Sequence, residues 1–308
     1  MNSKQWQCVD AGSDYCPCRL AEENSCIICT QLQGKGYCDC NWMGVCIYDE
    51  FYFSGNKMKG VRESREYPVI DSKIIDNIIV LSIQVTRYMS RALKQPGSYI
   101  FIRNRDSDHF FDVPMSIMDS DEEESSIKIA VEMRGVKTKK LADHGGALIV
   151  RGPYWNGVFG LSSLKTTQDA RCLVLARGIA QAPAILTIKH LLKNGNIVDV
   201  VVNKRVGEYN FIGEYFDMES MTETDMASDE VAALCKNLVK KNDYKLIFIG
   251  GSDLLQDKII KSVRKINSDV KFVTTNNNMI CCGEGICGSC TKRDKNGTLV
   301  KTCKAQRM

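Results

Sequence analysis

The chain has 308 residues, of which 44% are hydrophobic and 25% charged, and its net charge is only +4. That length can bury the cores of two ordinary domains, whereas so small a net charge gives no broad field for nucleic acid or an acidic membrane surface. No apolar run approaches the roughly 20 residues of a membrane-spanning helix, and the first residues contain no apolar signal segment. We therefore expect a cytoplasmic globular protein with no nucleic-acid partner and no membrane span.

Residues 1–60 are predicted to form a cysteine-rich metal-binding extension. Their cysteine spacing fits neither the bacterial ferredoxin run nor the paired C-x2-C knuckles of zinc ribbons. The segment has too few aliphatic residues for a core, so metal or packing on another part must hold it together. Iron–sulfur clusters and structural zinc both stay open, and the spacing does not reveal how eight thiolates would divide between two centres. The candidate ligands are Cys8, Cys16, Cys18, Cys26, Cys29, Cys38, Cys40 and Cys46.

Residues 66–166 are predicted to form a small antiparallel β-barrel. Short runs rich in β-branched residues, bounded by turn residues, predict six strands at 67–70, 77–86, 97–104, 113–119, 126–135 and 147–154. The acidic run 119–126 is expected to be a solvated hairpin loop. Residues 138–146 are expected to form one helical turn that ends at Gly145.

Residues 167–276 alternate between strand and helix patterns. This alternation predicts a parallel sheet covered by helices, in which a nucleotide binds at the carboxyl ends of the strands. Strands are expected at 171–176, 196–204, 244–251 and 270–277. Helices are expected at 180–195, 226–242 and 252–267, the first stopped by Gly195 and the last capped by Ser252 or Asp253.

The distribution of the cysteines points to metal centres at both ends of the chain. Of fifteen cysteines, eight lie within residues 8–46 and five within 281–303. Disulfides persist mainly in oxidising compartments, so such clusters in a cytoplasmic chain favour metal binding. The two isolated cysteines, Cys172 and Cys235, are expected to be small buried apolar residues.

Residues 277–308 are predicted to form a [2Fe–2S] cluster segment. Three cysteines are spaced C-x4-C-x2-C, and a fourth follows after twelve residues, which is the plant-type spacing. The glycines of this loop provide backbone freedom and expose amides to the sulfurs. Zinc and a redox thiol site are the alternatives, and only one C-x2-C pair is present for zinc. The predicted ligands are Cys282, Cys287, Cys290 and Cys303, with Cys281 set aside.

The order of these segments resembles one family, the electron-transfer subunits of dihydroorotate dehydrogenase B. Its relatives are the small subunits of sulfide dehydrogenase and of NADH-dependent ferredoxin:NADP oxidoreductase. The match covers roughly residues 66–303 and rests on MICCGEGICGSC at 279–290, which is similar to the family motif MxCGxGxCxxC with one extra residue. The resemblance implies a ferredoxin-reductase-like fold, with an FAD barrel, an NAD(P)-type α/β domain and a C-terminal [2Fe–2S] cluster.

The resemblance also assigns flavin-binding residues in the barrel. PMSI at 114–117 corresponds to an RPxSI motif whose serine lies against the isoalloxazine. Val113 replaces the arginine that grips the pyrophosphate, and Arg103 and Arg105 are candidate substitutes. Residues 135–138 correspond to a phosphate-binding turn, and a helix beginning there would offer its amides to a phosphate. The flavin candidates are therefore Pro114, Ser116, Ile117, Gly135, Lys137 and Thr138.

The nucleotide loop of the family, GGGIGxAP, corresponds here to ARGIAQAP at 176–183. Because loop glycines have become Ala176, Arg177 and Ala180, two readings stay open. Either Arg177 and Gly178 bind the phosphates of NAD(P), or the domain no longer binds a nucleotide.

The sequence contains no recognisable acid–base constellation, so the cofactors would carry the redox chemistry. We expect an electron-transfer subunit of a multi-subunit flavo-iron–sulfur oxidoreductase, rather than a complete enzyme. It would pass electrons between NAD(P)H or a partner's flavin, FAD and iron–sulfur clusters, and its partner would be a catalytic flavoprotein or another oxidoreductase subunit. The alternative is a non-catalytic iron–sulfur adaptor subunit with vestigial flavin and nucleotide sites.

Overall fold

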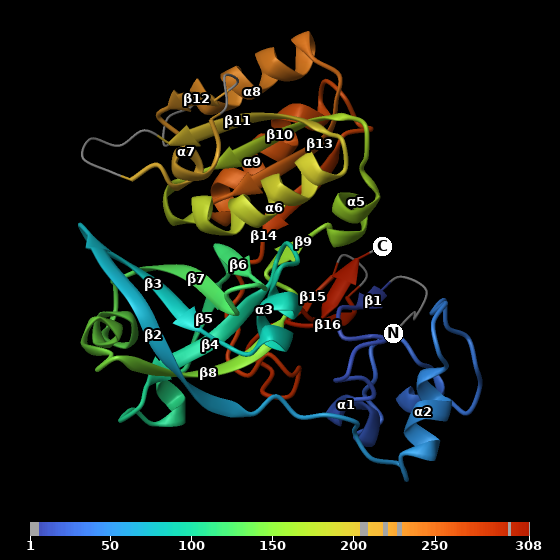
Figure 1. The fold of residues 1–308 in the computed structure, drawn as a ribbon. Coiled ribbons are helices and arrows are strands. Elements are labelled where there is room, and N and C mark those ends of the chain that lie inside the picture. The colour runs from blue at the N-terminus through green and yellow to red at the C-terminus, as the bar shows by residue number, and fades with distance from the viewer. Residues whose placement is uncertain (1–5, 204–208, 218–220, 227–229, 295–296, 308) are drawn as a thin grey trace. The chain divides into compact units, whose positions relative to one another are not determined.

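A computed structural model describes residues 6–203, 209–217, 221–226, 230–294 and 297–307 (Figure 1). Parts of some predicted segments lie outside these ranges: residue 204 of a strand, residues 227–229 of a helix, and residues 1–5, 295–296 and 308 of the cysteine-rich ends. The chain divides into two compact units. The cysteine-rich unit contains residues 1–64, 154–156 and 278–308, and the barrel–sheet unit contains residues 65–153 and 157–277.

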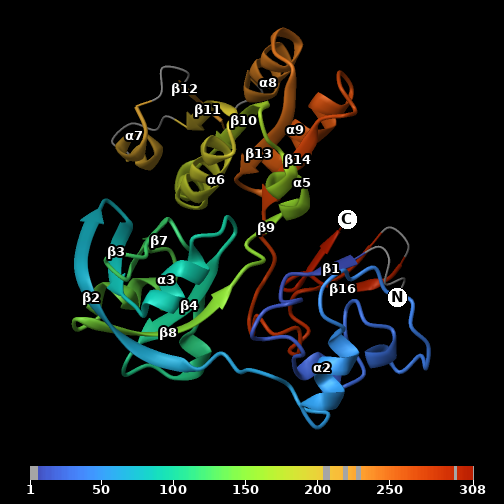
Figure 2. The same cartoon turned by 45° about the vertical axis from the view of Figure 1, so that its right-hand side comes forward.

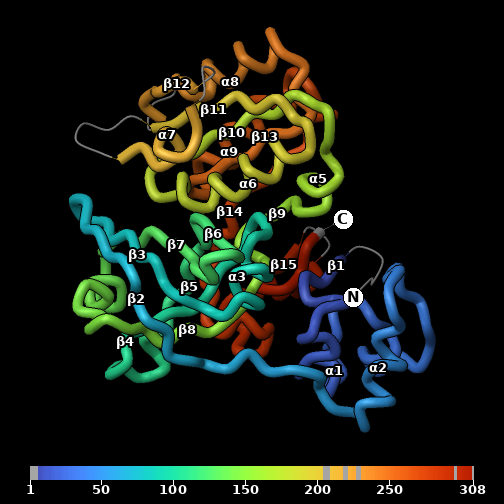
Figure 3. The backbone as a smooth tube through the Cα atoms, in the orientation of Figure 1, coloured from blue at the N-terminus to red at the C-terminus, as the bar shows by residue number. Residues whose placement is uncertain are grey.

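In the cysteine-rich unit the two ends of the chain share one small sheet. Strand β1 (Trp6–Cys8) pairs antiparallel with β17 (Ala305–Arg307), so blue and red segments lie side by side in Figure 3. Strands β15 (Thr291–Arg293) and β16 (Leu299–Lys301) form a hairpin. The remaining elements are α1 (Arg19–Glu22), η2 (Gln31–Gln33) and α2 (Ile47–Phe53).

The N-terminal segment supplies most of a small core, so the prediction that its aliphatic residues are too few for one was wrong. It also packs on the C-terminal segment, which was one of the two alternatives expected. Ile27, Ile28 and Ile47 share a small core with Val300 and Ala305. Since the apolar surface is supplied from both ends of the chain, neither segment has to build a core alone.

The first half of the barrel–sheet unit is a seven-stranded antiparallel sheet in the order β5-β4-β8-β2-β3-β7-β6. Its edge strands β5 and β6 are joined by only Ile117 and Met118, whose amides donate to Ser98 and Lys128. The sheet must therefore curl on itself, which agrees with the predicted barrel. The strands are β2 (Ser64–Ile75), β3 (Ile78–Gln84), β4 (Tyr99–Asn104), β5 (Val113–Ser116), β6 (Asp119–Asp121), β7 (Ser126–Glu132) and β8 (Ala147–Tyr154).

Two features of the barrel differ from the sequence prediction. Residues 87–93, left without a helix, form α3 (Arg87–Leu93), because the Thr86 hydroxyl accepts from the Met89 amide and Met89 and Leu93 share one buried face. The acidic run is not all loop, since Asp119–Asp121 pair with β7 and only the turn that follows is irregular. The predicted turn at 138–146 consists of α4 (Val136–Lys139) and η4 (Lys140–Asp143), and another short turn is η3 (His109–Phe111).

The second half is a six-stranded sheet in the order β12-β11-β10-β13-β14-β9, parallel except for β9. In Figure 2, α6 lies on one side of the sheet and α8 and α9 lie on the other. All four predicted strands and three predicted helices are present, and the Ser252 hydroxyl caps α9. The elements are β9 (Val158–Phe159), α5 (Leu161–Thr166), β10 (Arg171–Ala176), η5 (Gly178–Ala180), α6 (Gln181–Lys193), β11 (Ile197–Asn203), α7 (Phe211–Tyr215), β12 (Met221–Thr224), α8 (Glu230–Lys241), β13 (Tyr244–Gly250), α9 (Asp253–Arg264) and β14 (Lys271–Thr275).

Two further expectations concern burial and membrane spans. Cys172 and Cys235 are fully buried, as predicted for small apolar residues. Among the helices that the structure describes, none is long and apolar enough to cross a bilayer.

Candidate cofactor sites

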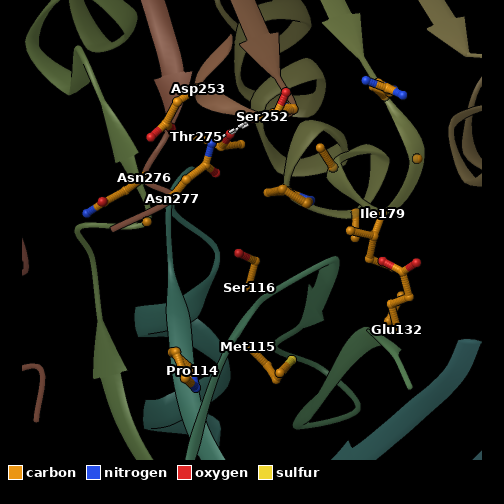
Figure 4. A pocket seen from close by; sticks show the side chains of 18 of the residues that line it. Pro114, Met115, Ser116, Glu132, Ile179, Ser252, Asp253, Thr275, Asn276 and Asn277 are labelled. Carbon is orange, nitrogen blue, oxygen red and sulfur yellow. Dashed lines mark hydrogen bonds between the residues drawn. The ribbon is translucent and has the colours of Figure 1, made fainter. Parts of the chain in front are cut away.

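A cavity of about 810 Å³ opens in the barrel–sheet unit between β5 and the carboxyl ends of the parallel strands. Figure 4 shows Met115 and Ser116 on one side and Ser252, Asp253 and Thr275 on the other. The carboxyl edge of a parallel sheet is where α/β proteins bind nucleotides, because loops and helix starts expose amides there. An adjoining cavity of about 490 Å³ continues along the barrel.

The predicted flavin residues are divided between these cavities and the barrel core. Pro114 and Ser116 line the larger cavity, and Gly135, Lys137 and Thr138 line the adjoining one. Ile117, in contrast, is fully buried in the core and faces neither cavity.

The phosphate-binding turn differs from the predicted helix. Helix α4 begins at Val136 rather than Thr138 and has only four residues. The helix dipole at its start is therefore too small to contribute to phosphate binding. The Thr138 hydroxyl accepts from the Arg134 and Gly135 amides at 3.1 and 3.2 Å, which occupies two donors intended for a phosphate. The Lys137 ammonium donates to the Phe110 carbonyl. This turn is therefore poorer in free donors than the sequence suggested.

The suggested substitutes for the missing arginine are held elsewhere. Arg103 forms an ion pair with Asp112 at 2.7 Å, and Arg105 forms one with Glu66. The cation that lines both cavities is Arg134, whose side chain is 75% exposed and pairs with Glu132 at 2.8 Å. No motif marked Arg134, although its place directly after a barrel strand could have drawn attention to it.

The loop at 176–183 follows β10 and leads into α6, as the nucleotide-loop prediction requires. Arg177 and Gly178 both line the larger cavity. A Cβ atom built on Gly178, or on Gly135, would meet nothing within 4 Å, so both backbone stretches face open space. The residues present therefore fit a dinucleotide at this edge, even though Ala180 has replaced a loop glycine.

The C-terminal cysteine loop has the conformation that cluster binding needs. Gly283, Gly285 and Gly288 have φ angles of 73, 75 and 81°, a region that disfavours other residues. A Cβ on Gly285 would lie 3.1 Å from Leu20 and 3.2 Å from Lys301. The Glu284 amide donates to Cys282 Sγ at 3.3 Å, so backbone amides point at sulfur.

The four predicted ligands of this loop are neighbours. Although burial opposes the thiolate, hydrogen bonds from Ser289 and Cys282 lower the pKa of Cys287 to about 7. A hydrogen bond from Cys303 lowers the pKa of Cys290 to about 6, and the same bond raises the pKa of Cys303. Cys303 also interacts electrostatically with Cys282, whereas Cys281 is exposed. The lowered pKa values of Cys287 and Cys290, two thiols of a glycine-rich loop, suit the donor set of a [2Fe–2S] cluster.

The sulfur atoms of these four cysteines lie near one another but do not surround a single point. Within the described ranges, no three His, Cys, Asp or Glu side chains converge as ready-made metal ligands. None of the fifteen cysteines, all of which the structure describes, forms a disulfide.

A buried network of four charges crosses the cysteine-rich unit. Arg62 donates to Asp10 at 2.8 Å and to Glu284 at 3.2 Å, and Lys304 contacts the same two carboxylates at 2.6 and 3.1 Å. The side chains of Arg62 and Lys304 are each only 1% exposed. The Tyr154 hydroxyl donates to Glu284 at 3.0 Å. The network joins the N-terminal segment to both the cluster loop and the residue after Cys303, and no sequence motif announced it.

Known proteins are similar to this chain in sequence and in fold. The chain is 25% identical, over 73% of its length and 86% of the relative's, to the electron transfer subunit of dihydroorotate dehydrogenase B (NAD(+)) from Clostridium acetobutylicum. The chain is homologous to these electron transfer subunits. No protein-family model matches it.

Solved structures agree on the architecture. The structure of an NADH-dependent reduced ferredoxin-NADP oxidoreductase, which concerns flavin-based electron bifurcation, matches with a TM-score of 0.62 and 19% identity, over 78% of this chain and 87% of that one. A ferredoxin reductase of carbazole 1,9a-dioxygenase matches with a TM-score of 0.51 and 12% identity, over 68% of each chain. The barrel–sheet unit therefore has the ferredoxin-reductase-like fold that the resemblance implied.

Proposed function

We propose that the protein is an electron-transfer subunit of a multi-subunit flavin- and iron–sulfur-dependent oxidoreductase, at work in the cytoplasm. It passes electrons between NAD(P)H or a partner's flavin, its own FAD, and iron–sulfur clusters. The observation that carries the proposal is that three thiols of the glycine-rich loop lie near Cys303, in a chain similar to such subunits.

FAD is the flavin proposed for the two adjoining cavities. Ser116 and Pro114 lie where the isoalloxazine would rest, and Gly135 and Lys137 border the phosphate end. Arg134, rather than Arg103 or Arg105, supplies the cation, because Arg134 and its ion-pair partner Glu132 line both cavities, whereas Arg103 and Arg105 line neither. FAD, when bound, accepts a hydride and gives up electrons singly, and the side chains orient it and exclude water.

The nucleotide proposed for the carboxyl edge is NAD(P). Gly178 leaves open space above the loop, and Arg177 borders the same cavity with a positive charge. The Arg177–Ala180 loop and the start of α9 would hold the pyrophosphate, and Ser116 lines the same cavity.

Cys282, Cys287, Cys290 and Cys303 are the proposed ligands of a [2Fe–2S] cluster. Such a cluster supplies one-electron transfer. The Glu284 amide, which donates to Cys282 Sγ, would stabilise the reduced cluster, because the reduced cluster carries more negative charge. The eight N-terminal cysteines are proposed to bind further iron–sulfur clusters or zinc. A catalytic flavoprotein or another oxidoreductase subunit is the proposed partner, since the relatives are themselves named as subunits.

The full chain purified without oxygen tests this function. We expect at least two irons per chain with matching acid-labile sulfide, and a flavin band near roughly 450 nm that NAD(P)H bleaches. Iron without flavin would instead support the adaptor alternative. The names of the relatives, which are electron transfer subunits, do not support that alternative. Zinc without iron would contradict both.

A further inference from the structure

A cavity in the cysteine-rich unit is lined by no residue of the C-terminal cluster loop. It is lined by Asp10, by apolar side chains such as Leu20 and Ile47, and by four of the eight N-terminal cysteines. These four are Cys8, Cys16, Cys18 and Cys26. The spacing of the cysteines did not reveal this division, which brings together residues from three separate stretches of chain.

The four thiols gather at one small core. Cys16 is buried in that core, and Cys8, Cys18 and Cys26 pack against it. Thiolates held against an apolar core would need a cation among them.

A backbone amide points at one of these sulfurs. The Cys29 amide donates to Cys26 Sγ at 3.4 Å. Amide-to-sulfur bonds are a common feature of ligated thiolates.

The C-terminal segment contributes a charge to the same place. The Val9 amide donates to the Lys304 carbonyl at 3.0 Å, and Cys8 pairs with Ala305 across the β1–β17 ladder. The buried Lys304 ammonium binds Asp10, which lines the cavity, at 2.6 Å. Without Lys304, the Asp10 carboxylate would face the thiolates with one neutralising cation fewer.

From these contacts we propose that Cys8, Cys16, Cys18 and Cys26 hold a second iron–sulfur cluster, with Lys304 as its positioning cation. Iron–sulfur is favoured over zinc because the site is apolar and no two of its four cysteines form a C-x2-C pair. The inference deepens the proposed metal binding by the N-terminal segment and does not depend on the flavin. The cluster exchanges single electrons, with its four sulfur bonds kept and no proton moved.

The remaining N-terminal cysteines provide matched controls. Cys38 and Cys46 are exposed and do not line the cavity. Their replacement by serine removes a thiol from the same segment without touching the proposed site.

The decisive experiment measures iron, acid-labile sulfide, zinc and flavin per chain, with electron paramagnetic resonance spectra of the dithionite-reduced full protein. Cys16→Ser and Cys26→Ser should each lose the iron and signal of one cluster and keep the C-terminal [2Fe–2S] signal. Cys38→Ser and Cys46→Ser should keep both. Equal loss in a control, unchanged iron in Cys16→Ser, or zinc in place of iron would overturn the proposal.

Lys304→Met tests the site with every cysteine intact, so it also covers the case in which a serine variant fails to fold. We expect a more negative midpoint potential for the N-terminal cluster, because a buried positive charge has been removed. An unchanged potential would refute the role of Lys304. Since flavin and the C-terminal signal are recorded on the same samples, failure of the electron-transfer proposal would be seen separately.

Discussion

Replacing Arg62 by methionine is expected to destabilise the cysteine-rich unit strongly. The guanidinium is 1% exposed and holds Asp10 and Glu284 at 2.8 and 3.2 Å. It also lies 3.9 Å from the Tyr15 ring centre and 4.5 Å from that of Tyr154. Methionine keeps most of the aliphatic volume, so the substitution removes mainly the charge.

The size of the effect follows from these contacts. Removing one partner of a buried ion pair costs roughly 3–5 kcal/mol, and each cation–π contact contributes about 0.5–1 kcal/mol. Lys304 still neutralises part of the two carboxylates, so we expect a loss of about 4 kcal/mol in the free energy of unfolding. With a urea slope of about 2 kcal/mol/M, the transition midpoint would fall by about 2 M.

Tryptophan fluorescence can follow this unit alone. All three tryptophans, Trp6, Trp42 and Trp155, belong to the cysteine-rich unit. The control is Lys59→Met, which removes an exposed cation paired with Glu50 at 3.0 Å and should leave the midpoint unchanged. Adding Glu284→Gln to Arg62→Met should restore part of the loss, because it removes an uncompensated charge. If Arg62→Met shifts the midpoint no more than Lys59→Met does, the buried network does not hold this unit together.

Three further outcomes are expected. Cys303→Ser should abolish the [2Fe–2S] spectrum, while Cys281→Ser, which changes an exposed neighbouring thiol, should keep it. Arg134→Met should weaken FAD binding about tenfold in a flavin titration. The control is Arg87→Met, because Arg87 is as exposed as Arg134 and is also ion-paired but lies far from it in the sequence, and this variant should bind FAD normally. Burial raises the pKa of Asp10, but pairing with Lys304 and Arg62 outweighs burial and lowers this pKa. The ionised Asp10 therefore stabilises the fold fully above about pH 4, and this stabilisation is lost as the pH falls through the lowered pKa. The fluorescence midpoint should therefore drop in acid for the wild type and drop less for Asp10→Asn.

The sequence predicted the regular parts of the fold because their patterns are local. The β-branched runs, the alternation of strands and helices, and end signals such as Gly195 and Ser252 each act over a few residues. The missed helix at 87–93 lies among strands, and its cap at Thr86 was the signal that could have revealed it. The β6 strand was missed because charged residues pair in a hairpin as long as they face solvent.

The candidate sites were predictable where one short motif carries the chemistry. The spacing of the C-terminal cysteines selected four thiols that the structure brings near one another. Nothing local marks Arg62 or Lys304 as buried, because burial depends on segments that meet only when both ends of the chain pack together. The same long-range packing determines which N-terminal cysteines share a cavity.

An anaerobic titration of the full chain with NADH follows electrons from the nucleotide site to the C-terminal cluster. We expect the flavin band to bleach and a [2Fe–2S] resonance to appear in the wild type, whereas in Cys303→Ser the flavin bleaches and no such resonance develops. A flavin-loaded wild-type sample that NADH and NADPH both leave oxidised, while dithionite reduces its cluster, would contradict electron entry through this chain's nucleotide site.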